Sequence, residues 1–73
     1  MIFEWKYFIV LCIENCYGKF VERVETDGLA VCDDVTVAKS FSSPEELLKW
    51  VSINTNLEMG KADFKIEGQY LPS

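Results

Sequence analysis

Residues 5–14 are the segment that most restricts the fold. They contain no glycine or proline, are rich in β-branched and aromatic side chains, and precede the turn-type residues 15–18, which predicts a β-strand ending in a turn. Apolar side chains fill both alternating sets of positions: Tyr7, Ile9, Leu11 and Ile13 on one side, Phe8, Val10 and Cys12 on the other. We therefore expect a central strand with both sheet faces covered. One helix covers only one face, so a terminus, a second subunit or a binding partner must cover the other.

The next segment predicts a hairpin. Residues 19–26 form the expected second strand, with Phe20 and Val24 on one side and Val21 on the other. Asp27–Gly28 predicts a type I′ turn, in which both central residues have positive φ. Residues 29–32 return as a third strand. Asp33–Asp34 then opens a turn or a single helical turn through residues 35–37, and residues 38–41 are expected to form a short further strand.

The beginning of a helix is clearly marked. Ser43-Pro44-Glu45-Glu46 supplies a capping serine, proline at the first helical position and glutamate three residues after the cap. The helix should run from Pro44 to about Thr55. Its expected buried face holds Leu47, Trp50, Val51 and Asn54, with Leu48 at the edge and Ile53 exposed.

The last strand is expected at residues 63–70, with Phe64, Ile66 and Tyr70 pointing inward, and residues 71–73 should leave the sheet. Residues 1–73 therefore predict a single α+β domain. It consists of a small antiparallel sheet of three to five strands packed against one α-helix, in the order β-β-β-(β)-α-β.

The charge balance restricts the partners. Twelve acidic residues against seven basic ones give a net charge of −5 at pH 7. Nucleic-acid affinity comes largely from neutralising phosphates, and anionic membranes attract basic segments. We therefore expect no direct nucleic-acid partner and no membrane; the sign of the charge favours a basic protein target. The longest apolar run, residues 7–13, is much shorter than the ~20 residues of a membrane span, and the chain is expected in the cytoplasm.

The residue inventory does not favour catalysis. The chain has no histidine, the usual base beside a serine or cysteine nucleophile, and its four glycines are isolated rather than grouped in a phosphate loop. We expect no enzymatic activity and no cofactor. Cys12, Cys16 and Cys32 do not supply a structural zinc site and are expected to be reduced, buried thiols. Since neither Asp33–Asp34 nor Glu45–Glu46 has a calcium-loop pattern, no metal is expected either.

Two sets of residues are candidates for partner binding. The first set is acidic, and we expect its members to gather at one end of the sheet: Glu22, Glu25, Asp27, Asp33 and Asp34. Such a surface either imitates nucleic-acid phosphates and occupies a basic groove, or is simply a solvated face. The second set comprises aromatic residues that exceed the needs of a small core, namely Trp5, Phe8 and Tyr17, together with Phe3 and Tyr70. They form an interface, or else Phe8 and Trp5 complete the core or a homodimer.

The order of several segments resembles a known group of proteins. These segments are residues 6–10, Lys-Tyr-Phe-Ile-Val; residues 38–47, with the sequence AKSFSSPEEL; Trp50-Val51; and residues 63–66, Asp-Phe-Lys-Ile. Their arrangement is similar to that of small uncharacterised proteins of phages and prophages in Gram-positive bacteria. The resemblance covers most of the chain and implies no site residues. It implies an accessory role, since phage proteins of this size often inhibit host or defence enzymes by binding them, anti-CRISPR proteins among them.

Two functional hypotheses follow. The first is a phage-encoded inhibitor or modulator that binds a host or defence protein, for example a CRISPR nuclease, through the acidic hairpin end or the apolar second face of the sheet. The alternative is a homo-oligomeric structural or assembly accessory protein, with a dimer seam that buries Phe8 and Val10.

Overall fold

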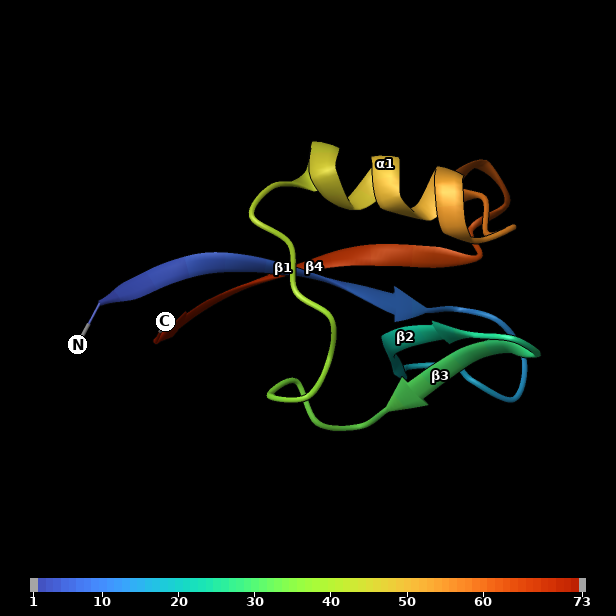
Figure 1. Cartoon of the computed structure of the whole chain (residues 1–73), viewed down its shortest axis with the longest axis horizontal. Helices are drawn as coiled ribbons and strands as arrows, with labels where there is room; N and C mark the ends of the chain where they lie inside the picture. Colours follow the sequence, from blue (N-terminus) through green and yellow to red (C-terminus); the bar gives the residue numbers. More distant parts are fainter. Residues whose placement is uncertain (1, 73) are drawn as a thin grey trace.

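The computed structural model describes residues 2–72, which form one four-stranded antiparallel sheet with a helix on one face (Figure 1). The order in the sheet is β3-β2-β1-β4. The elements, in chain order, are β1 (Phe3–Leu11), β2 (Phe20–Glu25), β3 (Gly28–Cys32), α1 (Pro44–Asn54), a 3-10 turn (Met59–Lys61) and β4 (Phe64–Pro72). The predicted α+β class is confirmed.

The strand β1 lies inside the sheet, as its sequence predicted. It pairs with β4 along its whole length, from Phe3 opposite Pro72 to Leu11 opposite Phe64. On its other edge it pairs with β2 near Val10 and then with a single residue, Phe41, which exchanges two backbone hydrogen bonds of 2.9 Å with Tyr7. The expected strand at residues 38–41 is thus reduced to one bridge.

Beyond that bridge, β1 and β4 continue alone as a two-stranded arm, which we define as residues 3–6 and 69–72 (Figure 1). This arm corrects two predicted boundaries. The first strand begins at Phe3 rather than at residue 5, and Leu71 and Pro72 stay in the sheet rather than leaving it. Ser73 lies outside the described residues.

The helix begins as its sequence predicts. The Ser43 hydroxyl accepts a hydrogen bond of 3.2 Å from the Glu46 backbone N–H, which satisfies one of the free donors at a helix N-terminus. Leu47 and Val51 are buried and Ile53 is 69% exposed, as expected, whereas the predicted inward residue Asn54 is exposed. The helix covers one face of the sheet over a core formed by Ile9, Leu11, Val21, Phe41, Leu47, Val51 and Phe64.

The faces of β2 differ from those predicted. Val21 lies opposite Val31, and Val24 lies opposite Leu29. Both partners pack against the helix-side core, so Val21 and Val24 share that face. The cause is a bulge between Val21 and Arg23, where the extra residue Glu22 reverses the alternation of the side chains.

The hairpin turn also differs. Thr26 and Asp27 are its central residues, because Glu25 pairs with Gly28. Among the non-glycine residues of positions 2–72, only Asn15 and Ala62 have positive φ, so neither central residue of this turn does. The predicted type I′ turn is therefore wrong, and Gly28, with φ of 143°, absorbs the unusual backbone conformation instead.

The second face of the sheet is covered by the chain itself. Phe8 and Val10 are only 1% and 5% exposed, and the Phe8 ring packs edge-on against Phe20 with centroids 5.9 Å apart. Val35 and Ala38 lie around the same hollow as Phe8, on the segment that runs from the end of β3 past β1 to α1 (Figure 1). No second subunit is needed to bury Phe8, and its predicted role as a partner-binding residue does not fit this burial.

Candidate functional site

Three exposed aromatic side chains gather on the arm. Phe3, Trp5 and Tyr70 are 47%, 58% and 58% exposed. The Tyr70 ring lies 5.5 Å from both the Phe3 ring and the Trp5 ring, measured between centroids. We call these three residues the aromatic face of the arm.

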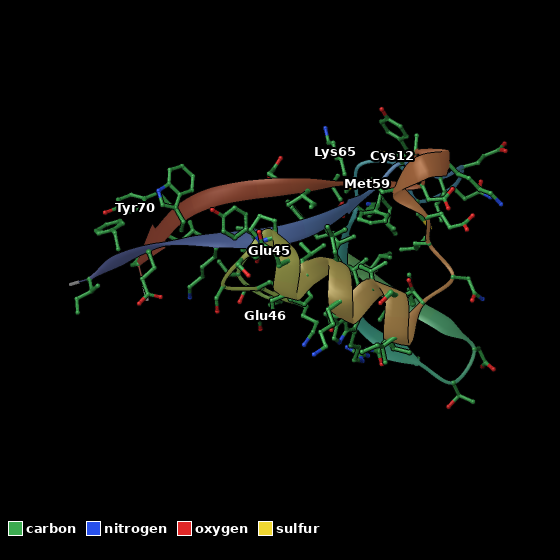
Figure 2. All side chains as sticks on the ribbon, turned by 90° about the horizontal axis from the view of Figure 1, so that it is seen from above. Cys12, Glu45, Glu46, Met59, Lys65 and Tyr70 are labelled. Atoms are coloured by element: carbon green, nitrogen blue, oxygen red, sulfur yellow. The ribbon has the colours of Figure 1, made fainter. Side chains whose placement is uncertain are left out.

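The position of the arm relative to α1 explains this exposure. Trp5 lies opposite Tyr70 in the sheet, and both point to the same side as Ile9 and Leu11, since alternate strand residues share a face. Figure 2 shows Tyr70 well beyond the start of the helix, which Glu45 and Glu46 mark. Tyr70 was predicted to be inward. It points to the helix side as predicted, but no helix lies above it.

A glycine supports the base of this aromatic face. Gly68 pairs with Tyr7, and a Cβ atom at Gly68 would lie 3.1 Å from Cε1 and 3.3 Å from Cδ1 of the Tyr7 ring. The same position is 3.6 Å from the Trp5 ring. Both rings therefore lean over the glycine, which leaves room for them and defines where they lie.

A shallow hollow of about 420 Å³ adjoins Trp5 at the base of the arm. It is lined by Glu4, Trp5, Lys6, Ser40, Phe41 and Ser42. The lining residue Phe41 is held in place by cation–π contacts: the Lys39 ammonium group lies 5.4 Å from the Phe41 ring and 5.3 Å from the Trp50 ring. The two rings are themselves 5.7 Å apart. The lining of the hollow is thus mainly polar, with Trp5 as its exposed apolar side.

The predicted acidic site is not a single patch. Glu25 and Asp27 lie at the hairpin tip, whereas Asp33 and Asp34 follow the opposite end of β3. Five strand residues separate the two groups by about 16 Å. The expectation that the acidic residues gather at one end of the sheet is therefore wrong.

Nearby basic groups also reduce the acidic charge. Arg23 bonds to Glu22 and, through Nη2, to Glu25 Oε1 at 2.7 Å. Lys19 Nζ lies 2.5 Å from Asp33 Oδ1. Because of these ion pairs, the acidic residues do not form a row of unpaired carboxylates that could imitate the phosphates of a nucleic acid.

Asp34 has a local structural role. Its carboxylate accepts hydrogen bonds from the Thr36 hydroxyl at 2.7 Å and the Thr36 backbone N–H at 2.9 Å. Both bonds favour the charged form and hold the pKa of Asp34 below its ordinary value, and the bond from the Thr36 hydroxyl has the larger effect. The predicted turn after β3 is confirmed and is stabilised in this way.

Tyr17 does not join the aromatic face. It is 76% exposed, but it lies in the turn after β1, at the end of that strand opposite the arm. Of the five candidate aromatic residues, the structure brings Phe3, Trp5 and Tyr70 together, whereas it buries Phe8 and places Tyr17 at the other end of β1. The alternation of Phe3 and Trp5 with the charged residues Glu4 and Lys6 is the sequence signal that would have indicated this surface.

Potential metal ligands do not gather in the described part of the chain. Cys12, Cys16 and Cys32 are free thiols of intermediate exposure. Across residues 2–72, no three histidine, cysteine or acidic side chains converge as metal ligands would. None of the helices found in that range is long and apolar enough to span a bilayer. The exposed aromatic face is thus the feature that most distinguishes the surface.

A comparison of the chain with protein-family models, with curated proteins and with solved structures finds no match to any of the three. The functional argument therefore depends on the chemistry of the surface.

Proposed function

We propose that this protein binds another protein through the aromatic face of its arm and modulates that protein by occupying its surface. The observation that carries the proposal is the contiguous row of Phe3, Trp5 and Tyr70, which remains exposed although the core beside it is complete. Aromatic residues are enriched at the centres of protein interfaces, because they bury a large apolar area with few rotatable bonds.

The charge and the resemblance suggest the kind of target. A net charge of −5 favours a basic protein by long-range attraction. The resemblance to phage and prophage accessory proteins favours a bacterial host or defence protein, such as a CRISPR nuclease, with inhibition as the outcome. Because the acidic residues are dispersed and partly paired, they contribute to attraction in this proposal rather than imitating a nucleic acid.

The dimer seam predicted for the homo-oligomeric alternative is already buried within one chain. Phe8 and Val10 are already covered within one chain, so a dimer that buries them would first require the segment at residues 35–38 to move away. Contact through the arm needs no such rearrangement.

Site-specific photo-cross-linking tests the proposal. A benzophenone amino acid replaces Trp5 in one variant and Tyr17, exposed at the other end of β1, in a matched control. Both are expressed in the bacterial host, and the cross-linked proteins are identified. We expect the Trp5 variant to capture one protein that the Tyr17 variant does not.

The captured protein is then purified for affinity measurements. Trp5→Ala and Tyr70→Ala are each expected to weaken binding about tenfold or more, as central aromatic contacts do. Ile53→Ala, at an exposed position on the helix, should leave the affinity unchanged. Equal affinities for the wild type and the Trp5→Ala protein would refute the role of the arm.

A further inference from the structure

The outer edge of β4 is open along its length. Tyr7 directs its N–H and C=O groups to Phe41, so the neighbouring β1 residues Lys6 and Phe8 direct theirs to β4. By the register of the two strands, Ile66, Gly68 and Tyr70 then point their backbone groups away from the sheet. No strand within residues 2–72 pairs with them, since β4 ends the sheet.

This edge has little protection against pairing. Long edge strands are usually shielded by charges, prolines, bulges or covering segments. Here the strand has nine residues without a bulge toward β1, only two charged residues, Lys65 and Glu67, and one proline at its far end, Pro72. Such an edge is a template for another strand.

Apolar side chains accompany the edge on the helix side. Ile66 is partly buried and packs against the core. Leu48 is 39% exposed and lies one helical turn after Glu45, therefore on the same side of α1. Figure 2 shows Glu45 on the side of the helix nearer β4 and Glu46 on the far side. A strand added to β4 would therefore cover apolar surface as well as backbone groups.

We propose that a second copy of this chain occupies the edge, with the two β4 strands antiparallel about a two-fold axis at Gly68. Gly68 then pairs with Gly68 of the second copy, Ile66 with its Tyr70, and Glu67 with its Gln69. Each residue whose backbone N–H and C=O groups point away from β1 then lies opposite a residue of the second copy with the same orientation. The two strands can therefore form hydrogen bonds in both directions, as an isologous interface requires.

The side chains select this register over its neighbours. An axis at Glu67 would place two glutamates directly opposite each other, which is unfavourable. An axis at Ile66 would direct Tyr70 of the second copy onto Ala62, where the backbone has left the strand with φ of 57°. With the axis at Gly68, Glu67 faces an amide, the same pairing that Gln69 Nε2 already makes with Glu67 within one chain at 2.7 Å.

The dimer would extend the binding surface described above, and in this respect the inference rests on the proposed function. Pairing about Gly68 places Tyr70 of each copy beside Ile66 of the other. The two aromatic faces then lie on one side of a continuous eight-stranded sheet. A target would meet two copies of Phe3, Trp5 and Tyr70 rather than one.

Sedimentation equilibrium of the full chain tests the pairing. The wild-type protein is expected to have the mass of two 8.4 kDa chains. Tyr70→Pro removes the ring and the outward N–H, whereas Tyr70→Thr removes only the ring, so the two variants differ in the seam hydrogen bond. We expect the proline variant to raise the dimer dissociation constant about tenfold or more relative to the threonine variant, since two symmetric bonds are lost. A wild type that stays at the mass of one chain overturns the proposal.

Disulfide trapping tests the register without a proline. Glu67→Cys with Gln69→Cys places thiols opposite each other across the two-fold axis, in the closely spaced type of strand pair. Mild oxidation should link two chains in this double variant. The single variant Glu67→Cys and the wild type, with its three native thiols, should not link. Linkage by Lys65→Cys with Glu67→Cys instead would overturn the register and indicate an axis at Ile66.

The results separate this inference from the proposed function. A monomer that still binds its target through Trp5 overturns the dimer alone. A dimer with target affinity that is unchanged in Trp5→Ala overturns the arm's role alone. A monomeric chain whose β4 edge cross-links to an extended segment of the target overturns self-pairing and assigns the edge to the target.

Discussion

Gly68 is the residue on which the aromatic face depends most directly. Its missing side chain leaves space for the Tyr7 and Trp5 rings, which lean over it from the neighbouring strand. Glycine usually weakens a strand, because it has no side chain to pack. Here the rings of the neighbouring strand cover it and compensate for that loss.

Gly68→Ala is expected to lower the free energy of unfolding by about 1–2 kcal/mol, because the new methyl group overpacks the space under Tyr7. Urea denaturation measures the effect. Gly60→Ala is the matched control, since nothing lies within 4 Å of a Cβ atom there, and it should change stability by less than about 0.5 kcal/mol. Equal effects at the two positions would contradict the packing role of Gly68.

Individual residues were predicted well where the strands alternate regularly and poorly where they do not. Phe64 and Ile66 pack inward as the period-2 pattern indicated. Phe20 and Val24 were placed on one face, but the bulge at Glu22 separates them. No local pattern marks a bulge in a strand with apolar residues of both parities, so the error could not be avoided from the sequence.

At the scale of elements, α1 has the best-defined boundary. Its N-terminus combines the Ser43 cap, Pro44 at the first position and two glutamates that favour the positive end of the helix dipole. These signals are local in sequence, and the predicted start at Pro44 is confirmed for that reason.

Ser43→Ala should lower the free energy of unfolding by about 1 kcal/mol, because the Glu46 N–H loses its partner. Ser42→Ala serves as the control, since Ser42 is exposed and does not cap the helix. The measurement is thermal unfolding followed by circular dichroism. The cap would be unimportant if both variants melted together with the wild type.

The ends of β1 and β4 show that local sequence patterns do not reveal pairing between distant residues. The arm exists because residues 3–6 pair with residues 69–72, which are far apart in the chain. Glu4 and Pro72 break the apolar pattern at both ends, so the sequence predicted strands that were too short. Tyr70 was therefore placed inward, and although Phe3, Trp5 and Tyr70 were all among the candidate aromatic residues, the sequence did not show that they lie together on one exposed face.

For the whole molecule, the decisive feature is that one short chain covers both faces of its own sheet. The helix covers one face, and the segment between β3 and α1 lies against the other near Phe8. The sequence showed that both faces needed cover, but it did not show that the eleven residues 33–43, which lie outside the helix and strands, would supply part of it.

Phe8→Ala tests this arrangement. Replacing a buried phenylalanine by alanine lowers the free energy of unfolding by about 3–5 kcal/mol. A single core of this size is expected to supply a total of only about 3–5 kcal/mol. We expect the variant to be largely unfolded at 25 °C by circular dichroism. Phe3→Ala, which removes an aromatic contact from the exposed arm, should cost only about 1 kcal/mol. A folded Phe8→Ala protein with wild-type stability would show that the second face is not packed.

The cation–π cluster of Lys39, Phe41 and Trp50 also has a spectroscopic consequence. The chain contains two indoles: Trp50, half-buried beneath an ammonium group, and Trp5, largely in water on the arm. Emission from the first should report on loss of the tertiary structure, and emission from the second on contact at the arm. In a Trp50→Phe background, a blue shift on adding a ligand would signal that Trp5 has become covered.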